Sequence, residues 1–326
     1  MSIGSIVKTG AAALRAAALV FLCAGLAACA GTPVADRLTA AETRPDDLPV
    51  RAELAATPFF AQTAFYCGPA ALAAVLNETG LETTPEALGA RVFTPGRKGS
   101  LQADVVTAAR RAGRLVLPVA SMTEGLEAVA AGDPVLILQN LGLEAAPQWH
   151  YAILIGYDLD AETAILRSGT TRRLVEDLAT LEHTWRRSGF WGRVAAAPDG
   201  PVPTTARAHD WLAEAAGIER AGLGAEALAA YRTGADHWPQ DGRFPLALGG
   251  ALFAQGDLAG AEKALREAVA RSPSSDAALN NLAYVRFRQG ALEDAEELAR
   301  RAIDLDGPNR EAARETLAEI RAARAS

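Results

Sequence analysis

Apolar positions follow different patterns in the two halves of the chain. Between residues 53 and 197, uninterrupted apolar runs at 134–140 and 150–158 are typical of buried strands, and segments with helical spacing lie among them. After residue 207, the segments have the spacing of helices. The pattern therefore predicts an α+β domain over residues 53–197 and an all-α domain over residues 208–326.

Two polar segments flank the first domain. Residues 29–52 are small, polar and proline-containing, and we expect them to form a tether that precedes the fold. Residues 198–207 also contain several prolines and are predicted to form a stiff linker between the two domains.

Small residues recur every 34 positions in the all-α domain. The columns in register include Ala227, Ala261 and Ala295, then Gly222, Gly256 and Gly290, then Pro239 and Pro273. This period resembles that of tetratricopeptide repeats, in which small residues lie where two antiparallel helices touch. The resemblance implies three repeats within residues 208–326, with a capping helix at 309–325. The expected concave, partner-binding face of the third repeat contains Asn280, Tyr284, Phe287 and Arg288.

The first 28 residues have the composition of an export signal. Lys8 and Arg15 supply positive charge, and the apolar stretch 16–28 is shorter than the ~20 residues that span a bilayer. The small residues before Cys29 resemble the bacterial lipobox, which implies a signal peptide over residues 1–28 and a lipid on Cys29. Since Ala30 and not Asp follows, we expect a lipoprotein of the cell envelope, anchored in the outer membrane and facing the periplasm.

Charge and composition exclude several classes of partner. The net charge of −7 argues against nucleic acid, because contacts to phosphates need a basic surface. One thiol with scattered histidines does not supply the ligands that zinc needs, so we expect no metal and no cofactor. The expected partners are a peptide or protein substrate, a protein bound by the repeats, and the membrane.

A lone thiol, Cys67, remains once the signal is removed and Cys29 is acylated. The apolar spacing that follows predicts a helix that begins near Gly68, with Pro69 in its first turn. The free N–H groups and the dipole at a helix N-terminus favour a thiolate. We therefore interpret Cys67 as a nucleophile, although most free cysteines are buried small hydrophobes.

A thiol nucleophile needs a base, and His150 has the best setting because it opens the apolar strand 150–158. The other histidines are His183, His209 and His237. Gln62 precedes Cys67 by five residues, and its amide can donate a hydrogen bond to the oxyanion of a tetrahedral intermediate.

These residues resemble a known family. Gln62, Cys67-Gly68-Pro69-Ala70 and His150-Tyr151 are similar to the motifs of the double-glycine leader peptidases, which process bacteriocins and belong to the papain superfamily of cysteine peptidases. The chain resembles more closely a group of bacterial lipoproteins that append tetratricopeptide repeats to such a domain. The resemblance implies a papain-like α+β fold. It assigns Cys67 as the nucleophile, His150 as the general base and acid, and Gln62 as the oxyanion donor.

Two positions depart from the family's pattern. Tyr66 stands where an Asp usually precedes the nucleophile, and Ser168 stands near the position of the Asp that usually orients the imidazole. Asp158 cannot replace that Asp, because it lies eight residues along the strand from His150, a distance of ~26 Å. We expect Ser168 or Thr170 to accept the imidazole N–H as a neutral orienting group.

The sequence thus predicts a membrane-anchored cysteine peptidase that cleaves an envelope protein or peptide. Two alternatives remain open. One is a non-catalytic scaffold for protein interactions, which the missing orienting carboxylate favours. The other is an acyl transferase that passes the thioester to an amine instead of water.

Overall fold

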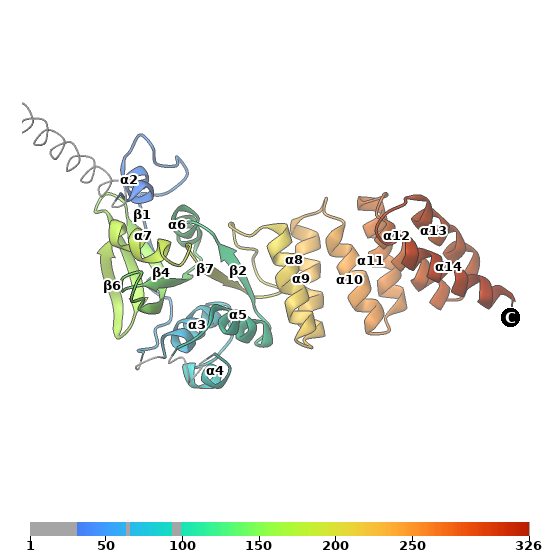
Figure 1. The fold of residues 1–326 in the computed structure, drawn as a ribbon, viewed down its shortest axis with the longest axis horizontal. Coiled ribbons are helices and arrows are strands. Elements are labelled where there is room, and N and C mark those ends of the chain that lie inside the picture. The colour runs from blue at the N-terminus through green and yellow to red at the C-terminus, as the bar shows by residue number, and fades with distance from the viewer. Residues whose placement is uncertain (1–30, 63–65, 93–98, 326) are drawn as a thin grey trace, which may run out of the picture.

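The computed structural model describes residues 31–62, 66–92 and 99–325. The expected signal peptide and the lipidation site Cys29 lie outside the described residues. Within the described ranges, no helix combines the length and the apolar character needed to cross a membrane. Figure 1 shows an elongated molecule, in which a mixed domain is followed by a row of helices.

The first domain is built on one antiparallel sheet. Its strands are β1 (Arg51–Glu53), β2 (Leu115–Val119), β3 (Val135–Asn140), β4 (Trp149–Asp158), β5 (Thr163–Ser168), β6 (Thr171–Asp177) and β7 (Gly192–Ala196). The order is β2-β7-β3-β4-β5-β6, and β1 also pairs with β4. The long strand β4 pairs with β3 over its first part and with β1 over its last, so it forms the centre of the sheet.

Helices cover both faces of this sheet (Figure 1). One face carries α3 (Cys67–Glu78), α4 (Pro85–Val92) and α5 (Gln102–Arg111), and the other carries α2 (Pro33–Thr39), α6 (Met122–Ala131) and α7 (Leu178–Arg186). Successive strand residues point to opposite faces. Thus Tyr151 and Ile153 pack under α3, whereas Ala152 and Leu154 pack under α6 and α7. The architecture agrees with the predicted α+β class.

The segment predicted to be a tether is packed onto the first domain. Helix α2 buries Ala35 and Leu38 in the same core as α6 and α7. A carboxylate oxygen of Glu182 on α7 accepts the N–H groups of Val34 at 3.1 Å and Ala35 at 2.8 Å. Strand β1 then extends the sheet beside β4. The tether prediction for residues 29–52 is therefore wrong over the described residues, because this polar segment has distant partners that fix it.

The second domain consists of helical hairpins and a final helix. Its helices are α8 (Ala208–Arg220), α9 (Gly224–His237), α10 (Arg243–Ala254), α11 (Leu258–Arg271), α12 (Asp276–Arg288), α13 (Leu292–Asp304) and α14 (Arg310–Ala325). Gly222, Gly256 and Gly290 end the first helix of each hairpin with φ of 85°, 83° and 81°. Glycine adopts this left-handed conformation without a steric penalty, which explains its 34-residue recurrence.

The edge strand β2 joins the two domains. Leu115 and Leu117 share a core with Trp211 and Ile218 of α8. Beside this core, Arg110 on α5 donates two hydrogen bonds to the carboxylate of Glu214, at 2.7 Å and 3.0 Å. The repeats are therefore docked against the edge of the sheet through a shared core, in addition to being connected by the linker (Figure 1).

Candidate active site

Cys67 is the first residue of α3, as the sequence predicts, and its side chain is half-buried. The helix starts here without a side-chain cap from Tyr66, so its first backbone N–H groups have no intrahelical acceptor. The next residue must be small, since a Cβ atom at Gly68 would lie 2.3 Å from the hydroxyl oxygen of Ser100. The local fold thus places a thiol at the positive end of a helix dipole.

His150 lies near the start of β4, and its Nε2 atom is 2.9 Å from the Oγ atom of Ser168 on β5. The pairing of Ile153 with Arg167 brings these two strand ends together. Burial holds the pKa of the His150 imidazole below its usual range, because the imidazolium loses hydration. The site therefore favours a neutral ring that can accept a proton.

One open cleft, with a volume of about 1260 Å³, collects the candidate residues. Its lining includes Gln62, Cys67, Trp149, His150 and Thr170. Within the described ranges, no hydrogen bond joins the Cys67 thiol to the His150 ring. The described structure thus brings the proposed nucleophile and base to the same cleft without a hydrogen bond between them.

Gln62 is tied to the strands that carry the histidine and the serine. Its backbone N–H donates to the carbonyl of Gly169 at 3.0 Å, and its side-chain amide is 3.5 Å from the carbonyl of Tyr151. The second contact is at the long limit for a hydrogen bond, so the amide can turn towards a stronger acceptor in the cleft.

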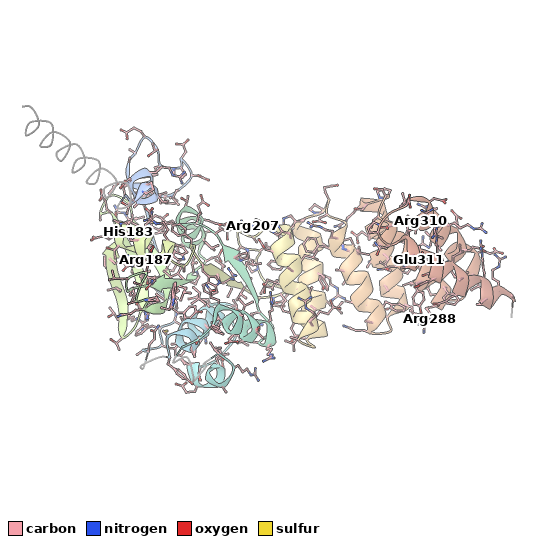
Figure 2. The ribbon with its side chains drawn as sticks, in the orientation of Figure 1. His183, Arg187, Arg207, Arg288, Arg310 and Glu311 are labelled. Carbon is pink, nitrogen blue, oxygen red and sulfur yellow. The ribbon has the colours of Figure 1, made fainter. Side chains whose placement is uncertain are left out.

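The remaining candidates lie elsewhere. Asp158 is at the far end of β4, opposite Thr163. Figure 2 shows His183 on the first domain, where its Nδ1 atom is 3.2 Å from Arg186. In the repeats, His209 is paired with Asp210 and His237 packs against Trp238. Among the described residues, no group of three or more His, Cys, Asp and Glu side chains could hold a metal ion.

Sequence reasoning missed Arg167, which is only 3% exposed. Its guanidinium donates to the carbonyls of Ala55 at 2.8 Å, Thr57 at 3.0 Å and Arg172. Burial lowers its pKa, and no carboxylate forms an ion pair with it among the described residues. Its position inside an otherwise apolar strand was the feature of the sequence that could have predicted a buried arginine. Arg167 fixes the segment that leads to Gln62 and is the neighbour of Ser168.

The family model of the tetratricopeptide repeat matches residues 219–276 and 246–310, so the prediction of these repeats is confirmed. No curated protein matches the chain. Among solved structures, a Bacillus anthracis protein described as a C39-like peptidase is 18% identical, with a TM-score of 0.38 over 45% of this chain and 97% of its own. The first repeat domain of human RPAP3 is 28% identical, with a TM-score of 0.34 over 36% of this chain and 92% of its own. The Yersinia enterocolitica chaperone SycD is 17% identical, with a TM-score of 0.34 over 36% and 86%.

Proposed function

We propose that this protein is a papain-like cysteine peptidase whose nucleophile is Cys67 and whose base is His150. The observation that carries the proposal is the shared cleft. A thiol at a helix N-terminus and a half-buried imidazole line it, and a hydroxyl 2.9 Å away holds one imidazole nitrogen. These are the parts that activation of a thiol requires.

The chemistry follows from the two ring nitrogens of His150. Because Nε2 contacts Ser168, Nδ1 is the nitrogen that takes the thiol proton. The sulfur of Cys67 attacks the scissile carbonyl carbon, and its oxygen becomes an oxyanion. The backbone N–H of Cys67 and the Gln62 amide stabilise that oxyanion. The imidazolium then protonates the leaving amine as the C–N bond breaks, and a thioester remains. Water, deprotonated by His150, cleaves the thioester to a carboxylic acid and restores the thiol.

The proposed reaction takes place in the cell envelope. A lipid on Cys29 would anchor the chain in the outer membrane, and the substrate would be a protein or peptide of the envelope. The repeats would bind that substrate or a separate partner, since such solenoids offer extended binding surfaces. Replacing Cys29 by Ser tests the anchor: palmitate labelling and membrane association should both be lost.

A second candidate is a non-catalytic scaffold that keeps the peptidase fold for protein interactions. Two observations favour it: the orienting group is a neutral hydroxyl, and the Cys67–His150 hydrogen bond is not made in the described structure. A Cys67→Ser variant that keeps full biological activity would support the scaffold.

The rate of Cys67 alkylation by iodoacetamide between pH 4 and 9 tests the peptidase. We expect the wild-type alkylation rate to stay high at pH values well below the reference thiol pKa of ~8.5. In His150→Ala, the rate at those low pH values should fall. His183→Ala is the matched control, because that histidine lies on α7 and contacts Arg186. An ordinary thiol curve, unchanged by His150→Ala, overturns the catalytic proposal.

A further inference from the structure

A second cavity lies in the repeat domain, between α10, α12 and the capping helix α14. Its volume is about 310 Å³, at the lower end of the range for ligand pockets. The lining residues that carry the argument are Gly250, Phe253, Asn280, Tyr284, Glu315 and Glu319. A cavity of this size takes one long side chain of a partner.

One wall of this cavity is aromatic. The rings of Phe253 and Tyr284 meet edge to face, with centroids 5.5 Å apart. Arg288, labelled in Figure 2, lies on the repeat domain. Its guanidinium is 5.8 Å from the centroid of Phe253. The ring therefore already receives a cation from its own chain, as the quadrupole of an aromatic face favours.

One residue that lines the cavity, Asn280, has an acceptor without a partner in the described ranges. The Oδ1 atom of Asn280 is buried and has no hydrogen-bond partner among the described residues. A buried acceptor without a donor is unfavourable, so a ligand N–H group is stabilised here if the Asn280 side chain turns its oxygen into the cavity.

Gly250 lines the cavity. It lies inside α10, where glycine is weaker than alanine as a helix former. Packing does not require it, because a Cβ atom there would meet nothing within 4 Å, whereas one at Gly249 would lie 2.5 Å from the Cγ atom of Leu265. The bare backbone at Gly250 is explained if a ligand occupies the space.

The rim on α14 is negative. Glu315 and Glu319 are exposed, lie one turn apart on the same helix face, and form no ion pair among the described residues. Two like charges at this spacing repel each other. A cation placed between them removes that repulsion.

We propose that this cavity binds a lysine or arginine side chain of a protein partner. The apolar stem packs on Phe253 and Tyr284, the cationic head lies between Glu315 and Glu319, and the Asn280 side chain turns its oxygen towards that head. The inference rests on the proposed role of the repeats as the partner-binding unit and does not use the chemistry of the Cys67 cleft.

Small probes that imitate the two parts of such a side chain test this proposal. We would titrate the full chain with n-butylguanidinium, n-butanol and butyrate and follow binding by saturation-transfer NMR. The guanidinium probe should bind at least tenfold tighter than butanol, and butyrate should not bind. The double variant Glu315→Gln/Glu319→Gln should weaken the guanidinium probe at least tenfold and leave butanol unchanged.

Two further variants separate the cavity from the rest of α14. Gly250→Leu should abolish binding of the guanidinium probe by filling the space. Glu311→Gln, on the same helix outside the cavity, should bind as the wild type does. Equal binding of guanidinium and butanol, stronger binding of butyrate, or a double variant that binds unchanged overturns the inference.

Probe binding by the repeats can be tested separately from peptide hydrolysis by the first domain. Cys67→Ala lacks the proposed nucleophile and should bind the guanidinium probe as tightly as the wild type. Probe binding without peptide hydrolysis overturns only the proposed peptidase, and hydrolysis without probe binding overturns only the present inference.

Discussion

The Nε2 atom of His150 lies 2.9 Å from the Oγ atom of Ser168, on the adjacent strand. A hydroxyl in this position fixes the plane of the imidazole and the nitrogen that faces the cleft, without adding a negative charge. The orientation of the proposed base is therefore built into the pairing of β4 with β5, whereas no carboxylate of the described residues forms an ion pair with the ring.

Removing the Ser168 hydroxyl should slow the proposed reaction. Ser168→Ala leaves the imidazole without its partner, a loss of about 1 kcal/mol, which corresponds to a roughly five- to tenfold lower kcat/KM. The decrease can be measured as the rate of peptide hydrolysis and as the rate of Cys67 alkylation. Ser168→Asn restores an acceptor and should recover most of the rate. Equal rates in wild type and Ser168→Ala would remove Ser168 from the site.

The pH profile should reflect the buried imidazole. Burial lowers the pKa of His150, so the neutral ring that accepts the thiol proton persists to lower pH. The acid limb of kcat/KM should therefore lie below ~6.5, the ordinary value for histidine. In Ser168→Asp a carboxylate favours the imidazolium, and the limb should move to higher pH. A wild-type limb above ~6.5 would contradict the assignment of His150 as a buried base.

Arg167 should act on the site through the segment before Gln62. Arg167→Met leaves the buried carbonyl of Thr57 and the partly covered carbonyl of Ala55 without their donor, and we expect the protein to lose about 2–4 kcal/mol of stability. The amide of Gln62 should exchange hydrogen faster, and kcat should fall more than KM rises. In a Gln62→Ala background, the effect of Arg167→Met on kcat should disappear. Additive effects of the two substitutions would show that Arg167 has only a structural role.

The ion pair between the domains should contribute to their docking. Glu214→Gln removes the partner of Arg110, whose side chain is 29% exposed, so part of the lost interaction is recovered by water. We expect a loss of about 1–3 kcal/mol in the free energy of unfolding, measured by urea denaturation. Glu311→Gln removes one partner of an exposed pair with Arg314 and should change stability by less than about 0.5 kcal/mol. Equal effects of the two variants would contradict a docked interface.

Asp133, in the turn between α6 and β3, should lower stability at neutral pH. Burial raises the pKa of its carboxyl group from the ordinary 3.8 to about 6, so the folded state binds its proton more tightly than the unfolded state does. This contribution is fully present below pH ~4 and is lost as the pH rises through about 6. Asp133→Asn should therefore be more stable than the wild type by about 1–3 kcal/mol at pH 7, and the two should converge towards pH 4.

The exposed Asp199 provides the control for this experiment. Asp199→Asn should change the free energy of unfolding by less than about 0.5 kcal/mol over the same pH range. A pH-independent gain in Asp133→Asn would mean that the substitution acts on packing and not on the charge.

Short stretches of sequence were sufficient to predict the class of each domain and the start of several helices. The recurrence of Gly222, Gly256 and Gly290 predicted the helical hairpins, because each turn needs a left-handed residue at its own position. The helix start at Cys67 was equally local, since Pro69 and the apolar spacing lie within the same turns. Residue types and spacing therefore sufficed for the class of each domain and for the candidate nucleophile.

The tertiary structure decided which distant segments meet. The contact of His150 with Ser168 depends on strand register, because a slip of one residue would turn the side chains to the other face. The predicted tether is instead held by Glu182, which is 147 residues from Ala35 in the chain. Arg167 likewise donates to the carbonyls of Ala55 and Thr57, which are more than 100 residues away in the chain. The periodicity of a sequence predicts local helices and strands. These contacts, in contrast, form only when the packed sheet brings remote groups within a few ångströms.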